Sequence, residues 1–304
     1  MQMNKLIRVL KNPLWLIVFF NNRGIHLFND RDYVKLLYRL TFGKKLNLDN
    51  PKTFNEKMQW LKIYDRKSQY SMMVDKYEAK KYVASIIGEK YIIPTYGIYN
   101  SFDEINFDSL PDEFVIKCTH DSGGLIIVRN KNQFDKNKAR KKINKCLKRN
   151  FYWIEREWPY KNVKPRIIIE KYMEDKNSND MRDYKFFCFN GEPKLMYLSE
   201  GLENHSTARI SFYDMNFNVT DCKRRDYELL DYTPSIPNTF EKMKKFATIL
   251  SKDIPHLRVD FYEINGKLYF GELTFFTCGG YVPFEDEKWD KQLGDYIKLP
   301  ITKK

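Results

Sequence analysis

The residues best suited to chemistry lie close together near the C-terminus, in residues 257–280, which read LRVDFYEINGKLYFGELTFFTCGG. Apolar and polar residues alternate along the first half of this stretch, as in a β-strand, and the alternation places Arg258 and Asp260 on one face. A second strand carries Glu272. Two carboxylates about 5 Å apart repel by about 3 kcal/mol at an effective dielectric constant of about 20, so a face that holds both needs a cation or a shared proton.

The turn between the two strands decides whether Glu272 joins this face. A two-residue Asn-Gly turn directs Glu272 to the face opposite Asp260. A three-residue loop over residues 264–266, with Gly266 left-handed and a bulge, pairs Glu272 with Arg258 and brings the carboxylates together. Without a left-handed Gly266 or another bulge the two carboxylates do not converge. They form either a magnesium site or two solvated charges with Arg258 as a surface partner.

Length and composition indicate a globular protein of about two domains with a sizeable core. The chain has 304 residues, of which 42% are hydrophobic and 31% charged, and its formal net charge is +13. Residues 129–150 alone carry ten Lys or Arg against one Asp. Within them Ala139, Ile143, Cys146 and Leu147 recur at helical spacing, which predicts an amphipathic helix with a basic face. That face is either only solvated, or it attracts a nucleotide, a phosphorylated sugar or an anionic membrane.

The five cysteines and four histidines are scattered. Because none has metal-ligand spacing, we expect reduced thiols in a cytoplasmic protein and no zinc site. Residues 14–20 are apolar and follow three cations, but seven apolar residues are too few to span a bilayer, and a poor signal-peptidase site follows them. We expect a buried helix here, with an interfacial anchor as the alternative.

Lys76 lies where a helix is expected to begin. Asp75 and Glu78 have the spacing of a capping box, which places Lys76 in the first helical turn. The helix dipole disfavours a cation there. We therefore expect Lys76 either in solvent or facing an anion.

Residues 114–125, FVIKCTHDSGGL, read as a buried strand that ends at Lys117 and is followed by the loop Ser122-Gly123-Gly124. Such a loop can hold a phosphate on its backbone N–H groups, with the lysine as a point charge. No Gly-Lys-Ser/Thr follows, so this is not a P-loop. The alternative is an ordinary hairpin turn.

Further strands are expected in residues 166–173 (RIIIEKYM) and 183–193 (DYKFFCFNGEP). Alternation puts Asp183 and Lys185 on one face of the strand. Either the two form a salt bridge, or Lys185 is directed at an anion. The first 70 residues read as helical, with a capping box that begins at Thr53. An amphipathic helix is expected over residues 238–252, with four inward residues: Phe240, Met243, Ala247 and Leu250.

Taken together, these segments resemble the ATP-grasp superfamily, and most closely its TupA-like branch, named for teichuronopeptide biosynthesis. The phrases PKTFNEKMQWLK, LPDEFVIKCTHDSGG, DYKFFCFNGEP and FGELTFF carry the resemblance, which runs from about residue 30 to 299. It implies an α+β fold in which two α+β subdomains enclose an ATP cleft. The implied division is a helical N-terminal region over residues 1–70 and an ATP-grasp domain over 71–304, with a mobile lid at about 112–172.

The resemblance also implies ATP and Mg²⁺ as cofactors and assigns three groups of residues. The nucleotide would be held by Lys76, Lys117, Ser122, Gly123, Gly124, Glu170, Lys171, Tyr172 and Met173. The metal would be bound by Asp260, Glu272 and Thr274. The catalytic cations beside the γ-phosphate or the acceptor would be Lys185 and Arg258. Thr274 stands where many members have Asn, and Phe276 where many have a basic residue, so the acceptor must be bound differently here.

The implied function is an ATP-dependent carboxylate–amine ligase of cell-surface polysaccharide biosynthesis, of the capsular or teichuronic type. It would join a uronic acid, free or linked to the polysaccharide, to an amino acid or amine through an acyl-phosphate. The alternative is a glycosyltransferase or phosphotransferase that uses a sugar nucleotide. We expect no nucleic-acid partner, because no RNA- or DNA-binding motif accompanies the basic charge. The expected location is the cytoplasm or the inner face of the membrane, with peripheral association through the basic helix or the N-terminus.

Overall fold

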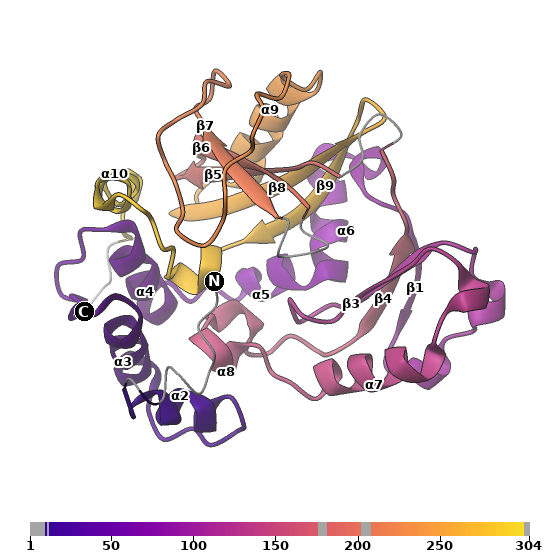
Figure 1. Cartoon of the computed structure of the whole chain (residues 1–304), viewed down its shortest axis with the longest axis horizontal. Coiled ribbons are helices and arrows are strands. Elements are labelled where there is room, and N and C mark those ends of the chain that lie inside the picture. The colour runs from indigo at the N-terminus through magenta and orange to yellow at the C-terminus, as the bar shows by residue number, and fades with distance from the viewer. Residues whose placement is uncertain (1–9, 11, 176–180, 202–207, 301–304) are drawn as a thin grey trace.

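A computed structural model describes residues 10, 12–175, 181–201 and 208–300. These residues form two antiparallel sheets and a set of helices (Figure 1). The four-stranded sheet has the order β1 (Thr95–Tyr99), β4 (Ile167–Lys171), β2 (Phe114–Cys118) and β3 (Leu125–Val128). The five-stranded sheet has the order β7 (Arg209–Tyr213), β6 (Glu192–Glu200), β5 (Asp183–Phe189), β8 (His256–Ile264) and β9 (Lys267–Thr274).

Helices precede, separate and follow the strands. The N-terminal helices are α2 (Trp15–Asn21), α3 (Asp30–Phe42), α4 (Phe54–Tyr64), α5 (Gln69–Val74) and α6 (Lys76–Ile87). The later helices are α7 (Lys136–Leu147), α8 (Tyr152–Glu155), α9 (Phe240–Leu250) and α10 (Glu287–Tyr296). The capping box at Thr53 is confirmed, since Thr53 and Glu56 each accept a hydrogen bond from the other's backbone N–H. The four inward residues predicted for α9 are buried, as expected.

The two faces of the five-stranded sheet have different covers, because side chains alternate along β5. Phe186 faces α9, where its ring centroid lies 5.9 Å from that of Phe240. On the opposite face Phe187 packs against Phe54 at the start of α4, with ring centroids 6.2 Å apart. Two residues earlier on that face is Lys185, which α4 does not cover. The face is therefore apolar at one end and charged at the other.

One hydrophobic core joins the N-terminal helices to the five-stranded sheet. It extends from Tyr33 on α3, through Phe54 and Phe187, to Leu293 on α10. A second core lies between the four-stranded sheet and α7, where Ala139, Ile143 and Cys146 are buried as predicted. Because the second core uses only one face of the four-stranded sheet, the other face is left to line a cavity.

The prediction of a buried helix at residues 14–20 is wrong in one respect. The helix forms as α2, and Trp15 and Val18 pack on the core, but Phe19 and Phe20 are 38% and 41% exposed. A helix that is apolar all round can bury only the sides that other elements cover. Among the helices that the structure describes, none is long and apolar enough to cross a membrane.

We predict that Gly294→Ala destabilises the protein, because α10 packs directly on the start of α4. A Cβ at Gly294 would lie 2.3 Å from the carbonyl oxygen of Lys52 and 2.6 Å from the carbonyl carbon of Thr53. Overpacking of this kind costs about 1 to 3 kcal/mol of unfolding free energy. Urea denaturation would measure it, with Lys291→Ala on the exposed side of α10 as the control. Equal stability of the Gly294→Ala and wild-type proteins would contradict this packing.

Candidate active site

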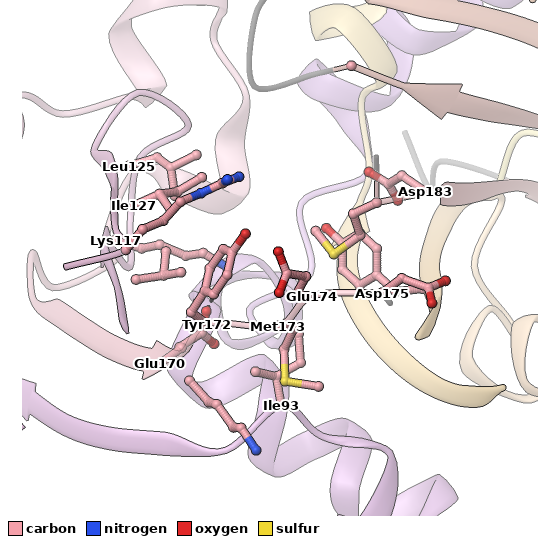
Figure 2. Close-up of a pocket in the computed structure, with 16 residues that line it drawn as sticks. Ile93, Lys117, Leu125, Ile127, Glu170, Tyr172, Met173, Glu174, Asp175 and Asp183 are labelled. Carbon is pink, nitrogen blue, oxygen red and sulfur yellow. Dashed lines mark ion pairs between the residues drawn. The ribbon is translucent and has the colours of Figure 1, made fainter. Parts of the chain in front are cut away.

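A cavity of about 320 Å³ lies between the two sheets. Val115, Leu125 and Ile127 form an apolar wall from the four-stranded sheet. Five of the residues predicted to hold a nucleotide line the same cavity: Lys117, Glu170, Lys171, Tyr172 and Met173. Figure 2 shows Lys117, Glu170 and Tyr172 on one side of the cavity and Asp183, from the five-stranded sheet, on the other. The arrangement is a pocket with an apolar wall, and seven of its sixteen lining residues are charged. An apolar surface combined with convergent polar groups is typical of small-molecule sites.

A buried carboxylate between two lysines forms one end of the cavity. Glu170, 5% exposed, accepts from Lys80 at 2.5 Å and pairs with Lys117 at 2.6 Å. Lys80 also donates to the Thr95 hydroxyl at 2.8 Å. Burial alone would raise the pKa of Glu170, but the two ammonium groups outweigh it and lower that pKa to about 2. Glu170 is therefore ionised, and it pairs with both Lys80 and Lys117, of which Lys117 lines the cavity.

The other end is a network of charges centred on Asp260, which is fully buried. Arg258 donates from Nε and Nη2 to the two oxygens of Asp260, both at 2.7 Å. Lys185 on the neighbouring strand β5, directly opposite in the register, donates to Asp260 at 2.7 Å and also contacts Asp183. Burial, and after it the charge of Asp260, raise the pKa of Asp183 to about 6, although Lys185 opposes them. The network connects Asp260 to the wall of the cavity through Asp183.

Glu272 joins this network through a β-bulge. β8 and β9 pair in one register up to Phe261 opposite Phe270, and in a register shifted by one from Val259 opposite Leu273. Gly271 and Glu272 therefore lie together opposite Asp260. Arg258 Nη2 reaches Glu272 Oε1 at 2.6 Å and so joins the two carboxylates.

The bulge corrects the predicted geometry of this hairpin. The connecting turn has two residues, Asn265 and Gly266, with φ of 52° and 71°, and not the three residues of the loop expected to pair Glu272 with Arg258. The carboxylates converge by the alternative route, a bulge within the strands. Arg258 pairs along the backbone with Thr274, not with Glu272. The extra residue enters at Gly271 instead, where a Cβ would meet the Tyr262 ring at 3.0 Å and the Asp260 carbonyl oxygen at 3.1 Å.

Lys76 approaches the network from the start of α6. Asp75 caps this helix, accepting from Tyr77 and Glu78 backbone N–H groups at 2.8 and 3.1 Å. Lys76 lines a small pocket of about 20 Å³ with Glu272. Its Nζ donates to the Asp121 carbonyl oxygen at 2.7 Å. Burial lowers the pKa of Lys76, and the Glu272 charge opposes that change.

The loop Ser122-Gly123-Gly124 connects the hairpin strands β2 and β3. Ser122 and Gly123 line a separate hollow between β3 and α7, and none of the three residues lines the central cavity. The buried Asp121 carboxylate holds the loop, since it accepts from the Gly123 backbone N–H at 3.1 Å and pairs with Arg149. The loop is thus an ordered hairpin turn in this structure.

The predicted metal ligands supply oxygen atoms of the kind that Mg²⁺ prefers. The Thr274 hydroxyl lies 3.2 Å from Glu272 Oε1. The Glu272 side chain is 46% exposed. Partial burial would raise its pKa, but the positive charges of Arg258, Lys185 and Lys76 outweigh that effect and lower the pKa to about 2. Within the described ranges no group of three or more His, Cys, Asp or Glu could hold a metal ion. The donor types fit magnesium, although Arg258 and Lys185 already neutralise Asp260.

A family model described as TupA-like ATPgrasp matches residues 56–298, from α4 to just beyond α10. The chain belongs to the TupA-like ATP-grasp family. The membership confirms the superfamily and the ATP-grasp fold that the sequence motifs predicted. No curated protein matches this TupA-like chain by sequence.

Solved structures resemble the TupA-like protein only distantly. D-alanine–D-alanine ligase from Bacillus anthracis complexed with ATP is 16% identical, with 67% of this chain and 55% of that chain covered and a TM-score of 0.40. D-alanyl-alanine synthetase A from Vibrio cholerae is 13% identical, with 79% and 62% covered and a TM-score of 0.42. Phosphoribosylamine–glycine ligase from Thermotoga maritima is 12% identical, with 68% and 48% covered and a TM-score of 0.37. The chain thus spans about half to three-fifths of the length of these proteins.

Five charged residues of the TupA-like site were not among the predicted site residues: Lys80, which pairs with Glu170, and Arg129, Glu174, Asp175 and Asp183, which line the cavity. Lys80 lies four residues after Lys76, on the same face of α6, and that spacing could have pointed to it. Asp183 was expected only as a partner of Lys185. Its place at the cavity depends on the pairing of β5 with β8, which residue types alone do not specify.

We predict that Glu170→Gln lowers the unfolding free energy at pH 7 by about 3 to 5 kcal/mol, because it leaves buried Lys80 without its counter-ion. The folded-state pKa of Glu170, about 2, lies below its ordinary value of 4.5. The stabilisation is therefore complete above about pH 5 and is lost as the pH falls towards 2. Urea denaturation at several pH values should show the wild type and Glu170→Gln converging in acid. The control is Glu241→Gln, whose side chain is 82% exposed. A constant difference at all pH values would contradict the assignment.

Proposed function

We propose that this protein is an ATP-dependent ligase that joins a carboxylate to an amine. Membership of the TupA-like ATP-grasp family supports ATP as the substrate that supplies the energy. The observation that carries the proposal is the placement of two charged clusters about one cavity. Glu170 with its lysines lies at one end, and Asp183 leads to Asp260 at the other. Such a site can hold a base in its apolar part and phosphates among its cations.

The proposed binding roles of the residues follow from their positions about the cavity. Lys117 and Lys76 bind phosphate oxygens, and the backbone of residues 171–173 holds the adenine beside Glu170. The four-stranded sheet, which lies mostly within residues 112–172, is the proposed lid. The loop over residues 122–124 would close over the phosphates by moving from its present position.

The reaction proposed is the usual two-step activation of a carboxylate. The acceptor carboxylate oxygen attacks the γ-phosphorus, which releases ADP and forms an acyl-phosphate, and an amine then displaces phosphate to form the amide. Arg258 and Lys185 stabilise the negative charge that develops on the transferred phosphoryl group. Asp260, Glu272 and Thr274 are the proposed ligands of magnesium, which would neutralise phosphate charge when bound.

The proposed acceptor is the carboxylate of a uronic acid in a cell-surface polysaccharide or its precursor, and the amine is an amino acid or simple amine. The TupA-like family assignment supports this class. Product analysis tests it with glucuronic or galacturonic acid and a panel of amino acids. ADP, phosphate and an amide support the ligase. Release of a nucleoside diphosphate from a sugar nucleotide would instead support a glycosyltransferase.

Calorimetry provides a direct test of the nucleotide site. We predict that ADP binds more tightly with Mg²⁺ than without it. The variant Lys117→Met should lower the affinity for ADP under both conditions by about tenfold or more, because a phosphate contact is lost. Lys267→Met, at an exposed position on β9, is the matched control. Absence of ADP binding under both conditions would overturn the proposal.

Glu272→Gln tests the metal assignment with little risk to folding, because this side chain is half exposed. We predict that it removes most of the magnesium dependence of ADP binding and lowers turnover by about a hundredfold or more. Asp260→Asn, which keeps the shape of the side chain, is expected to do the same. Near-normal turnover of either variant would show that these carboxylates do not bind the metal.

A further inference from the structure

Residue 10 and residues 12–28 expose a large amount of apolar surface. Eight large hydrophobic side chains are exposed here: Leu10, Leu14, Leu16, Phe19, Phe20, Ile25, Leu27 and Phe28. The other eleven exposed large hydrophobics are scattered over the remaining described residues. Concentrated apolar surface of this kind marks an interaction site. We call these eight residues the apolar patch.

The backbone under the apolar patch is held firmly by polar contacts. The buried Asn21 side chain donates to the Tyr33 hydroxyl at 3.0 Å and to the Trp153 carbonyl oxygen at 2.5 Å. Arg156, fully buried, donates to Asn21 Oδ1 at 2.9 Å. His26 stacks on Trp153 with ring centroids 3.6 Å apart. The exposure of the patch is therefore a property of the fold and not of a loosely attached segment.

The basic helix α7 is connected to this region through α8. Only residues 148–151 separate it from α8, and Trp153 of α8 contacts Asn21 and His26 beside the patch. In the view of Figure 1, α2 and α7 lie in the lower part of the molecule, and α8 lies further in, between them. Exposed cations of α7 and the residues after it are Lys136, Lys138, Arg140, Lys141, Lys142, Lys145, Lys148 and Arg149. The segment that carries the apolar patch is thus linked, through α8, to a strongly positive helix.

We propose that the apolar patch and α7 together dock on an anionic lipid bilayer. The apolar patch enters the interfacial region, and the lysines of α7 face lipid phosphates. Apolar insertion combined with a basic cluster gives the two signals that stable peripheral binding needs. The charge favours a negatively charged surface over a second copy of this chain, whose formal net charge is also positive. The inference does not rest on the proposed ligase activity.

Co-sedimentation of the full chain with lipid vesicles tests the docking. Binding to phosphatidylcholine vesicles that contain about one third phosphatidylglycerol should exceed binding to pure phosphatidylcholine by about tenfold or more. Raising the salt from about 0.1 M to about 1 M should weaken it, because the Debye length falls from about 10 Å to about 3 Å. No binding to the anionic vesicles, or equal binding to both kinds, overturns the proposal.

Two double variants separate the apolar and basic contributions. Phe19→Ser with Phe20→Ser, and Lys141→Glu with Lys145→Glu, should each weaken vesicle binding by about tenfold or more. The matched controls, Ile236→Ser, at a position 59% exposed, and Lys245→Glu on α9, should bind as the wild type does.

Circular dichroism and ADP calorimetry on every variant distinguish loss of docking from loss of the fold or of the nucleotide site. If the Phe19 and Phe20 changes leave vesicle binding intact, the apolar patch does not insert. If they dissociate a dimer without affecting lipid binding, the patch binds a second copy of the chain. Either result overturns the proposal.

Discussion

The fully buried carboxylate of Asp260 is the constraint on which the site depends. An ionised carboxylate without partners is too costly to bury, so the surrounding strands must supply cations. Arg258 lies two residues earlier on the same face of β8, and Lys185 lies directly opposite on β5. The pairing of the two central strands is thus fixed by charge at one end of the sheet face. At the other end Phe187 of β5 and His256 of β8 contact each other and both pack on Phe54.

Because one end of this sheet face is apolar and the other is charged, the N-terminal helices have different roles at the two ends. α4 covers the apolar end and joins it to α10, so the charged end is the part left for α6 and the four-stranded sheet to approach. α6 then brings Lys76 to the pocket that Glu272 lines, and Lys80 to Glu170. A single helix therefore contacts both charged clusters.

The sequence predicted most of the parts but not how they meet. Hydrophobic periodicity was sufficient to predict α9 and α7, because the buried residues of a helix recur every three or four positions. Alternation placed Arg258 and Asp260 correctly. The isolated Gly271 within the strand pattern was a local signal for the bulge, because a side chain there would contact Tyr262 and the Asp260 backbone. The expected burial of α2 failed because apolar residues favour the interior only where another element is present to cover them. Residue types at Lys80 likewise do not indicate which carboxylate will face them.

The balance of charge about the cavity constrains how ligands can enter. Four cations are paired with four carboxylates there: Lys80, Lys117, Lys185 and Arg258 with Glu170, Asp183, Asp260 and Glu272. A phosphate chain added alone would leave excess negative charge in this partly buried region, and a divalent cation alone would leave excess positive charge. The two are therefore expected to bind together. Phosphate oxygens would then pair with the cations, and the carboxylates would be the ligands of the metal. Until then, each of these eight charges is paired within its own cluster.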